Sequence, residues 1–300
     1  MRRISQCTVC RTLIVALLGT FVLGRVAGQP ASLPPGELVK RVVANEAKVD
    51  DQTVKFMFKQ RKETPGGSQT RLLVQTREAI VAMTVAFNDH PLSLEQRQGE
   101  FGRVERFISE PEELRRKERK EKEDAERIQR ILRALPEAFL YEYDGTEAGR
   151  PGVGRPGEEL VRLKFRPNPK YDPPTHVEQV LTGMQGVILV DPKEQHIARI
   201  DGTLMKDVGF GWGILGHLDK GGHFLVDQSD VTQNNWSITR MDLAFTGKIL
   251  LFKNLFIKST EVYSDFRPVP ATLTFPQGVQ LLKKEMNEVP ENQPRSASSN

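Results

Sequence analysis

The sequence predicts an α+β protein built mainly on antiparallel β-sheet, with about ten to eleven strands, an N-terminal helix and one long charged helical excursion. Three observations carry this prediction. Apolar and polar residues alternate with a period of two in many short segments. Turn residues separate most of these segments at hairpin length, which favours antiparallel pairing because parallel strands need long crossovers. Two segments, at about 35–48 and 93–135, show helical periodicity instead.

The first 28 residues have the layout of a secretory signal peptide, in which basic residues precede a short apolar stretch and small residues follow it. The apolar stretch runs from Leu13 to Leu23, and Val26-Ala27-Gly28 supplies the small residues. This stretch is shorter than the about 20 residues that a membrane span needs. We therefore expect cleavage and export of a soluble protein, with an uncleaved anchor as the alternative.

The leader also accounts for two features of the composition. The whole chain has 43 Lys and Arg against 39 Asp and Glu, and the leader holds four arginines and no acid. The mature chain is thus expected to carry no net charge, which argues against a nucleic-acid partner. The only cysteines, Cys7 and Cys10, lie in the leader as well. We therefore expect no disulfide, thiol nucleophile, or zinc or redox role for this Cys-x-x-Cys motif.

After the leader, residues 29–286 are predicted to form a single β-rich domain, since domains of this class often exceed 200 residues. The sequence between residues 130 and 270 contains no long flexible linker. The last segment, 287–300, is polar and rich in Pro and Ser. It lacks the apolar content that would offset its ordering entropy, so we predict a disordered tail.

In the N-terminal third, Pro34-Pro35 and an acidic residue in the first turn predict a helix over about 35–48. The period then changes from helical to two, and the turn Pro65-Gly66-Gly67 separates the first two of three strands. We predict an antiparallel meander of these strands, at 53–59, 71–76 and 80–87.

The next segment, from Ser93 to about Leu135, is predicted to be helical, with a capping box at its start and an interruption at Pro111. Residues 112–127 contain seven acidic and seven basic residues, many spaced i, i+4 with the acid first. The balanced charge and scarce apolar residues favour a solvated helical arm. A nucleic-acid-binding tail and a coiled coil with a partner are the alternatives.

Strands are predicted again after Leu135, beginning with 138–143 and 161–165. A glycine- and proline-rich loop at 149–157 separates them, and 176–182 is expected to form one or two helical turns. We take Thr246-Gly247 as a turn between strands. The further strands are predicted at 185–190, 196–204, 223–227, 235–245, 248–256 and 258–266.

The segment Gly211 to Gly216 matches G-x-G-x-x-G, but glycines follow within six residues and leave no room for the helix that binds a pyrophosphate. We interpret it as a glycine-rich bend whose large apolar residues form either the rim of an apolar pocket or a plug for the core. These residues are Phe210, Trp212, Ile214 and Leu218.

No catalytic or metal-binding constellation is evident. The five histidines are scattered, and His217, Asp219 and His223 offer the one arrangement in which a metal is conceivable. Serine-nucleophile motifs are absent, and Glu261 with Asp265 is the one carboxylate pair that we single out. We expect no cofactor, no metal and no enzymatic activity, with a hydrolase as the least favoured alternative.

The order of elements resembles the outer-membrane lipoprotein-sorting, or LolA-like, superfamily. The segments Phe210–Phe224 and Ser264–Pro270 are similar to uncharacterised exported bacterial proteins of that group. The resemblance implies a half-open β-barrel around a helix, with an apolar cavity for acyl chains, in the periplasm of a Gram-negative bacterium. The charged helical arm departs from the pattern of the carriers, and no cavity arginine can be transferred to a position here.

Two functions follow as hypotheses. The first is reversible binding of a lipid or lipoprotein acyl chain in an apolar barrel cavity, with at most peripheral membrane contact. The candidate cavity residues are Phe56, Phe58, Phe87, Tyr141, Phe210, Trp212 and Ile214. The second is an envelope adaptor with a fully packed barrel, whose charged arm and outer sheet bind a protein partner.

Overall fold

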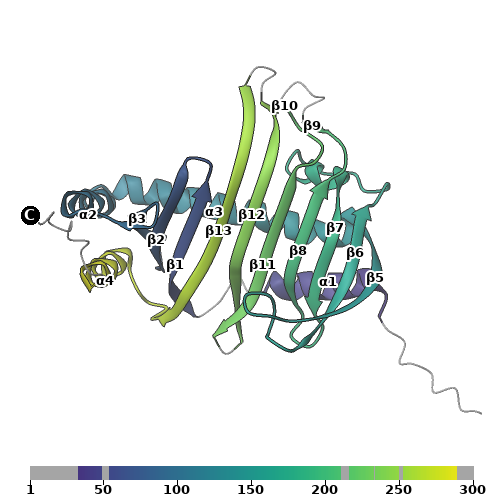
Figure 1. The fold of residues 1–300 in the computed structure, drawn as a ribbon, viewed down its shortest axis with the longest axis horizontal. Coiled ribbons are helices and arrows are strands. Elements are labelled where there is room, and N and C mark those ends of the chain that lie inside the picture. Colours follow the sequence, from purple (N-terminus) through teal and green to yellow (C-terminus); the bar gives the residue numbers. More distant parts are fainter. Residues whose placement is uncertain (1–32, 49–53, 211–215, 233, 250–252, 289–300) are drawn as a thin grey trace, which may run out of the picture. The chain divides into compact units, whose positions relative to one another are not determined.

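The alternating segments form one antiparallel sheet in the computed structural model, which describes residues 33–48, 54–210, 216–232, 234–249 and 253–288. The strands follow the order β4-β3-β2-β1-β13-β12-β11-β8-β7-β6-β5, and β10 joins β9 to β12 (Figure 1). The sheet ends at two edges and is not closed on itself. An α+β fold with mainly antiparallel strands is therefore confirmed.

Thirteen strands are present in the described part of the chain. Ten of them have eight or more residues, in line with the ten to eleven expected, and the remaining three have two or three residues. Their bounds are β1 Lys55–Thr64, β2 Gly67–Gln75, β3 Ile80–Phe87, β4 His90–Pro91, β5 Phe139–Ala148, β6 Glu159–Pro167, β7 Met184–Asp191, β8 His196–Leu204, β9 Val208–Phe210, β10 Gly216–Leu218, β11 His223–Thr232, β12 Asn235–Ile249 and β13 Lys253–Val269.

The helical segments also follow the sequence pattern closely. The N-terminal helix begins at a proline, and the capping box predicted at Ser93 and Gln96 is present with both of its hydrogen bonds. The excursion is broken at Glu110, immediately before Pro111, as expected. The helices are α1 Pro35–Glu46, α2 Leu94–Ser109, α3 Pro111–Ala138 and α4 Phe275–Glu288, with a short 3₁₀ helix, η2, at Glu178–Gly183.

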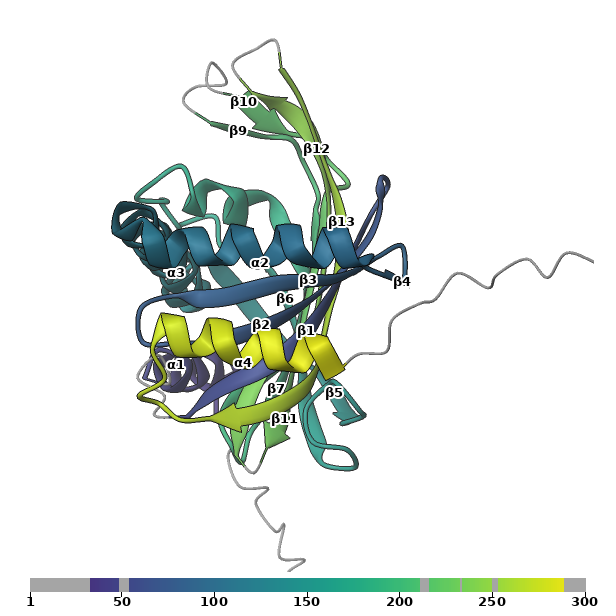
Figure 2. The same cartoon turned by 90° about the vertical axis from the view of Figure 1, so that its left-hand side faces the viewer.

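One face of the sheet, which we call the inner face, packs against α1 and α3 (Figure 2). The apolar side of α1 is buried, and the C-terminal end of α3 contributes Leu135 and Ala138 to the same cluster. On the sheet the cluster includes Leu163 and Ile188, which lie opposite each other on β6 and β7. The inner face of β5–β8 is therefore filled by helices.

The opposite, outer face is covered by α2 and α4 at β1–β3. Met57, Val74 and Val81 are cross-strand neighbours on that face and form a cluster with Phe275 and other apolar residues of α4. The two helix pairs thus lie on opposite faces of the sheet. Beyond β1, no described helix covers the outer face. It carries charged side chains such as Arg199 and Asp227. It also carries a small buried cluster of Val153, Leu160, Leu189, Ala198 and Trp236.

The free edge of β3 is closed by side chains of the two helices beside it. A strand edge presents unpaired N–H and C=O groups that invite pairing with another chain. Here Glu121 of α3 accepts a hydrogen bond from the backbone N–H of Ile80 at 3.0 Å, and Glu100 of α2 accepts one from Thr84 at 3.0 Å. Arg103 donates to the carbonyl oxygen of Ala82 at 2.6 Å. These bonds anchor one end of the charged excursion to the sheet.

The excursion is therefore not a free arm. Most side chains of residues 118–130 are exposed, as the charge pattern predicts, but both ends of α3 are packed. Leu114 lies against the α4 cluster, and Ile131 and Leu132 lie against the inner cluster.

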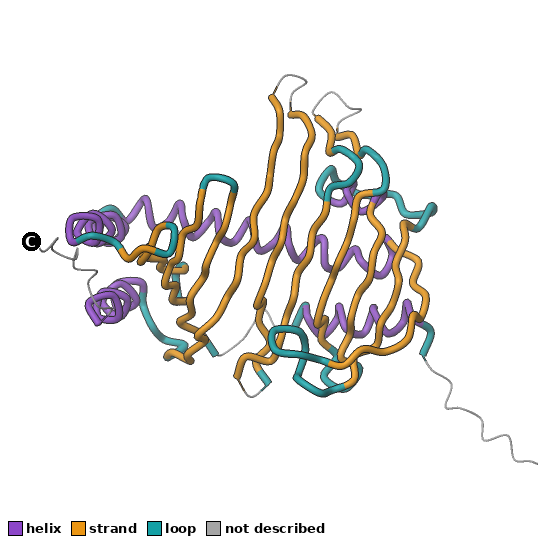
Figure 3. Tube along the Cα trace, in the orientation of Figure 1, coloured by secondary structure: helices purple, strands orange, loops and turns teal. Residues whose placement is uncertain are grey.

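Two boundaries predicted from the sequence are wrong. The strands expected at 235–245, 248–256 and 258–266 are two long strands, β12 and β13 (Figure 3). Thr246-Gly247 continues β12 because Gly247 provides room for β10, where any β-carbon would collide with the carbonyl oxygen of His217. Residues 287 and 288, which the sequence assigned to a disordered tail, instead form the end of α4. Residues 289–300 lie outside the described part, so the tail itself stays a prediction.

Helix α4 itself was not anticipated, although its pattern is visible in the sequence. Phe275, Val279, Leu282 and Met286 recur at i, i+4, i+7 and i+11, and all four are buried. Among the described residues, no helix is long and apolar enough to cross a membrane.

The close approach of α4 to the sheet gives a stability prediction. A β-carbon added at Gly278 would lie 2.7 Å from Thr76 Cγ2 and 3.0 Å from Val81 Cγ2. We expect Gly278→Ala to lower the free energy of unfolding by about 1–3 kcal/mol, since overpacking outweighs the gain in helix propensity. Gly99→Ala in α2 is the matched control, because nothing lies within 4 Å of its added β-carbon. That variant should be neutral or stabilising by up to about 1 kcal/mol. Urea titration of both variants measures the difference, and equal effects would contradict the packing argument.

Candidate functional site

The candidate site lies where two central strands separate. β12 and β13 pair from Ile249 and Lys253 as far as Arg240 and Val262, and no further. Below that point β12 pairs with β11 alone and β13 with β1 alone, so the strands diverge (Figure 3). A hollow of about 720 Å³ lies at the divergence. We call it the β12–β13 hollow.

Two β-bulges explain the divergence. In the first bulge, Thr239 is an extra residue of β12 with no partner on β11. It lies next to Arg240, the last residue of β12 that pairs with β13. The second lies in β13 opposite Phe58, where Asp265 has a positive φ of 57°. A bulge bends its strand and increases the local twist. Two bulges on adjacent strands, close to the last mutual pair, turn the strands away from each other.

A loop at residues 149–157 forms one wall of the hollow on the outer face. Its sequence repeats Gly-Arg-Pro-Gly, and three of its glycines, at 152, 154 and 157, have positive φ. Thr239 donates a hydrogen bond to the carbonyl oxygen of Gly152 at 2.6 Å, and Ser229 donates to that of Gly154 at 2.8 Å. These bonds hold the loop on β11 and β12. The Gly-Arg-Pro-Gly repeat is the sequence signal from which a structured loop could have been predicted here.

The outer rim of the hollow is ionic. Arg199 of β8 binds Asp227 of β11 through two hydrogen bonds, of 2.6 Å from Nε and 2.9 Å from Nη2. Arg240 and Asp242 of β12 form a second pair at 2.9 Å. Asp227 is 3% exposed, so its charge requires this bidentate partner.

One oxygen of the rim has no partner. Asp242 uses Oδ2 for Arg240, whereas its Oδ1 is buried and accepts no hydrogen bond from the described residues. A buried acceptor without a donor is costly, which makes Oδ1 the natural position for a donor from a ligand.

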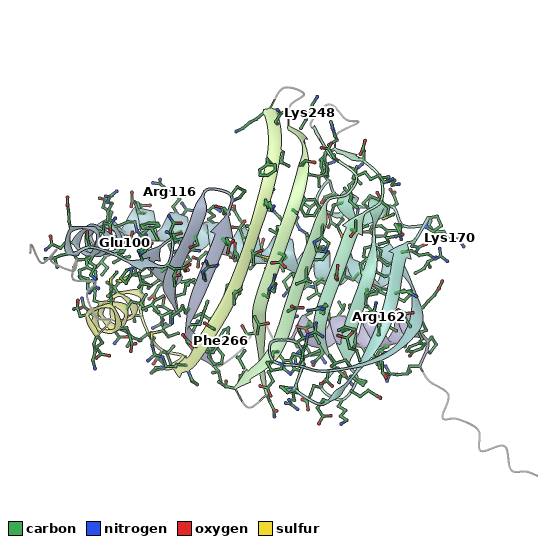
Figure 4. The ribbon with its side chains drawn as sticks, viewed as in Figure 1. Glu100, Arg116, Arg162, Lys170, Lys248 and Phe266 are labelled. Atoms are coloured by element: carbon green, nitrogen blue, oxygen red, sulfur yellow. The ribbon has the colours of Figure 1, made fainter. Side chains whose placement is uncertain are left out.

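The opposite wall is aromatic. Tyr263 and Phe266 of β13 line the hollow, and Figure 4 shows Phe266 on the lower part of that strand. Behind them, Phe58 stacks on Phe266 with ring centroids 5.3 Å apart. Phe56 meets the same ring edge-on at 6.1 Å. Together with Leu73 these rings form a small apolar cluster on β1, β2 and β13.

A buried carboxylate supports this aromatic wall from the inner face. Glu261 accepts hydrogen bonds from Gln60 and from the hydroxyl of Tyr263, both at 2.6 Å, and pairs with Lys62 at 2.8 Å. Burial alone raises the pKa of this carboxyl, but the bonds from Lys62, Tyr263 and Gln60 outweigh burial and lower it. Burial and the bond to Glu261 raise the pKa of Tyr263, which stays a neutral donor.

The structure brings some of the predicted cavity residues together and separates others. Phe56 and Phe58 belong to the aromatic wall. Tyr141 and Phe210 lie at the inner cluster, where the hydroxyl of Tyr141 donates to the carbonyl oxygen of Leu135 at 2.8 Å. Phe87 is 44% exposed at the end of β3. Trp212 and Ile214 lie outside the described residues, so their place in a cavity stays a prediction.

The polar residues singled out in the sequence do not converge. His217 pairs with Asp219 at 3.1 Å, and His223 with Asp201 at 2.9 Å. No group of three or more metal-ligating side chains occurs among the described residues. Asp265 pairs with Lys59 at 2.7 Å, so it shares no partner with Glu261.

Three further hollows are formed by described residues. One of about 300 Å³ lies beside the capped edge of β3, and two of about 620 and 480 Å³ share Asn168 and Tyr171 after β6. Each is lined by charged as well as apolar side chains. The β12–β13 hollow is larger than these and is the one that joins an aromatic wall to an ionic rim.

Comparison with known proteins assigns no family. No family model matches the sequence, and no curated protein matches it. One match among solved structures is the crystal structure of a DUF1329 family protein from Desulfovibrio piger. The identity is 10%, the TM-score is 0.28, and the match covers 78% of this chain and 93% of that chain. A likeness of this extent carries no argument about function.

The Glu261 cluster gives a pH prediction. Because the pKa of the folded carboxyl lies below its ordinary value of 4.5, the unfolded chain binds the proton more readily. The contribution of Glu261 to the free energy of unfolding is therefore present above pH 4.5 and lost as the pH falls through the folded pKa. Glu261→Gln should cost about 1–3 kcal/mol at neutral pH and flatten the loss of stability below pH 4.5.

The exposed Glu126→Gln of α3 is the control for this experiment, since Glu126 makes no hydrogen bond or ion pair with a described residue. Urea titrations between neutral and acid pH measure both variants. An acid limb of the Glu261→Gln variant that parallels the wild type would contradict the assignment.

Proposed function

We propose that this chain is an exported, non-catalytic binding protein that takes an acyl-chain amphiphile, a lipid or the lipid part of a lipoprotein, in the β12–β13 hollow. The observation that carries the proposal is the meeting of an aromatic wall and an ionic rim in one hollow of about 720 Å³. Ligand sites in proteins are hollows of this size, with apolar walls and a few placed polar groups.

The aromatic wall supplies the site for the chain. Tyr263 and Phe266 line the hollow, and Phe58 stacks on Phe266, so that this ring is held in place. Val231 and Leu225 add apolar surface from β11. Each methylene that leaves water for such a surface contributes about 0.8 kcal/mol when fully buried.

The ionic rim supplies the binding groups for the polar end of the ligand. The unpaired Oδ1 of Asp242 calls for a hydroxyl or ammonium donor on the ligand. Arg150 and Arg240, both exposed at the rim, offer donors to phosphate or carboxylate oxygens. Because Asp227 and Asp242 are each engaged by an arginine, we assign them to binding and not to proton transfer.

The fold and the leader are consistent with this role. An open antiparallel sheet with helices on its inner face corresponds to the half-open barrel that the sequence resemblance implies. The leader is consistent with export, and the neutral mature chain with a partner that is not a nucleic acid. We propose a periplasmic location in a Gram-negative bacterium on these grounds.

A second function, an envelope adaptor, is favoured by two observations. The inner face of β5–β8 is filled by α1 and α3, as a packed barrel requires. The outer face of β5 and β6 carries paired charges instead. Arg162, labelled in Figure 4, and Lys164 both pair with Asp144. Such a surface suits a charged protein partner more than a lipid.

A variant that fills the hollow tests the first function. Val262 lies at the last β12–β13 pair and is 39% exposed, so Val262→Trp adds bulk to the hollow without entering the core. We expect native mass spectrometry to show co-purifying lipid on the wild-type protein, and fluorescent fatty-acid binding to fall about tenfold or more in the variant. Ile128→Trp is the control, because Ile128 is 64% exposed on α3 and does not line the hollow. The proposal would be contradicted if the wild-type protein carried no co-purifying lipid and bound no fluorescent fatty acid.

A further inference from the structure

The long strands β12 and β13 extend beyond their neighbours and form a finger. β11 pairs with β12 only as far as Ala244, and β1 pairs with β13 only as far as Thr260. The five residues of β12 after Ala244 span roughly 17 Å at 3.4 Å per residue. We call residues 245–249 and 253–259, with β9 and β10 beside them, the finger (Figure 1).

The outer face of the finger combines an exposed ring with lysines. Phe256 is 65% exposed, and Lys258 lies two residues along the same face of β13. Lys248 of β12 lies opposite Asn254 of β13, on the same face as Phe256 and nearer to the end of the finger (Figure 4). A single exposed ring is common on a protein surface, and what distinguishes Phe256 is the lysines beside it on the same face.

The charges of the finger are all of one sign. Residues 243–249 and 253–260 contain no acidic residue, and they contain three lysines, Lys248, Lys253 and Lys258. All three lysines are exposed, and none forms an ion pair with a described residue. Lys120 of α3 meets Asp124, whereas Lys40, Lys122 and Lys170 are exposed without an ion pair to a described residue, so the finger is distinguished by the grouping of its lysines.

We propose that the finger binds the surface of an anionic lipid bilayer. Phe256, which shares the outer face with Lys248 and Lys258, enters the boundary between head groups and acyl chains, while the lysines bind the anionic head groups. The proposal is independent of the ligand in the β12–β13 hollow. That hollow lies at the other end of the same two strands.

The backbone limits how deep the finger goes. Between Lys253 and Ser259, β13 pairs with β12 on one edge and with no described strand on the other. Unpaired backbone groups cannot enter the hydrocarbon core without a large cost. The finger therefore stays in the head-group region, where water and phosphate oxygens satisfy that edge.

The same edge is a poor site for a second copy. Antiparallel pairing of two β13 edges would bring the lysines of two chains together, and lysine on an edge strand is a common means of preventing such pairing. Like charges placed opposite each other destabilise a strand pair. A lipid surface of opposite charge meets no such repulsion.

Binding of the full-length mature protein to vesicles tests the proposal. The wild type should bind vesicles of phosphatidylcholine with about 30 mol % phosphatidylglycerol, bind phosphatidylcholine alone far more weakly, and dissociate in about 0.5 M salt. Replacing Lys248, Lys253 and Lys258 together by Gln should weaken binding about 100-fold, which is about fivefold for each lysine. The same three positions changed to Arg should keep wild-type binding.

Two matched controls test whether binding depends on the finger itself or only on the net charge and the exposed apolar residues of the protein. Lys40, Lys122 and Lys170 are exposed elsewhere, and their replacement by Gln removes the same charge. Phe256→Ser should weaken binding about tenfold, whereas Ile128→Ser, at a position 64% exposed against 65% for Phe256, should not. Circular dichroism of each variant confirms that the fold is kept.

Three outcomes would overturn the proposal. The first is a wild type that does not bind anionic vesicles, and the second is a triple Gln variant that binds as well as the wild type. The third is a finger that pairs copies of the chain, seen in sedimentation velocity as a dimer that Phe256→Ser abolishes while vesicle binding is unchanged. Val262→Trp should bind vesicles like the wild type, so a failure of the hollow and a failure of the finger are distinguishable.

Discussion

The pairing of β1 with β13 is the interaction on which the rest of the structure depends. It joins the first strand of the chain to the last, so that residues about two hundred positions apart, such as Gln60 and Glu261, share a hydrogen bond. Without it the meander β1–β3 and the strands β5–β13 would be two separate sheets. Closing so long a loop costs entropy, and the ladder, the buried Glu261 cluster and the aromatic rings of Phe58 and Phe266 offset that cost together.

The same pairing also creates the candidate site. Beyond the last mutual pair, Arg240 and Val262, each of the two central strands pairs with a different neighbour, β12 with β11 and β13 with β1. The bulges at Thr239 and Asp265 make this possible, since each bends its strand at the point where mutual pairing stops. A site between diverging strands needs no separate domain or lid, and its walls come from elements that the sheet already holds in place.

Most charged side chains discussed above form ion pairs on the outer face of the sheet or hydrogen bonds to the free edge of β3. Arginine and carboxylate pairs such as Arg199–Asp227 lie on the part of the outer face that no described helix covers, and Glu100, Arg103 and Glu121 satisfy the free edge of β3. Such exposed pairs contribute little to stability individually, but they block strand addition at the edge and keep the sheet apart from other chains. The finger is the contrast, because residues 243–249 and 253–260 contain three lysines and no acidic residue.

The sequence alone determined the class of fold, the N-terminal helix, the broken charged excursion and most strands, because these depend on local periodicity, capping and turn residues. The pattern of α4 at Phe275, Val279, Leu282 and Met286 is also local and present in the sequence. The pairing of β1 with β13, the length of β12 through Gly247 and the hollow beside Phe266 were decided by the tertiary structure. They arise from contacts between residues far apart in the chain, and a local pattern holds no information on which distant strand will satisfy an edge.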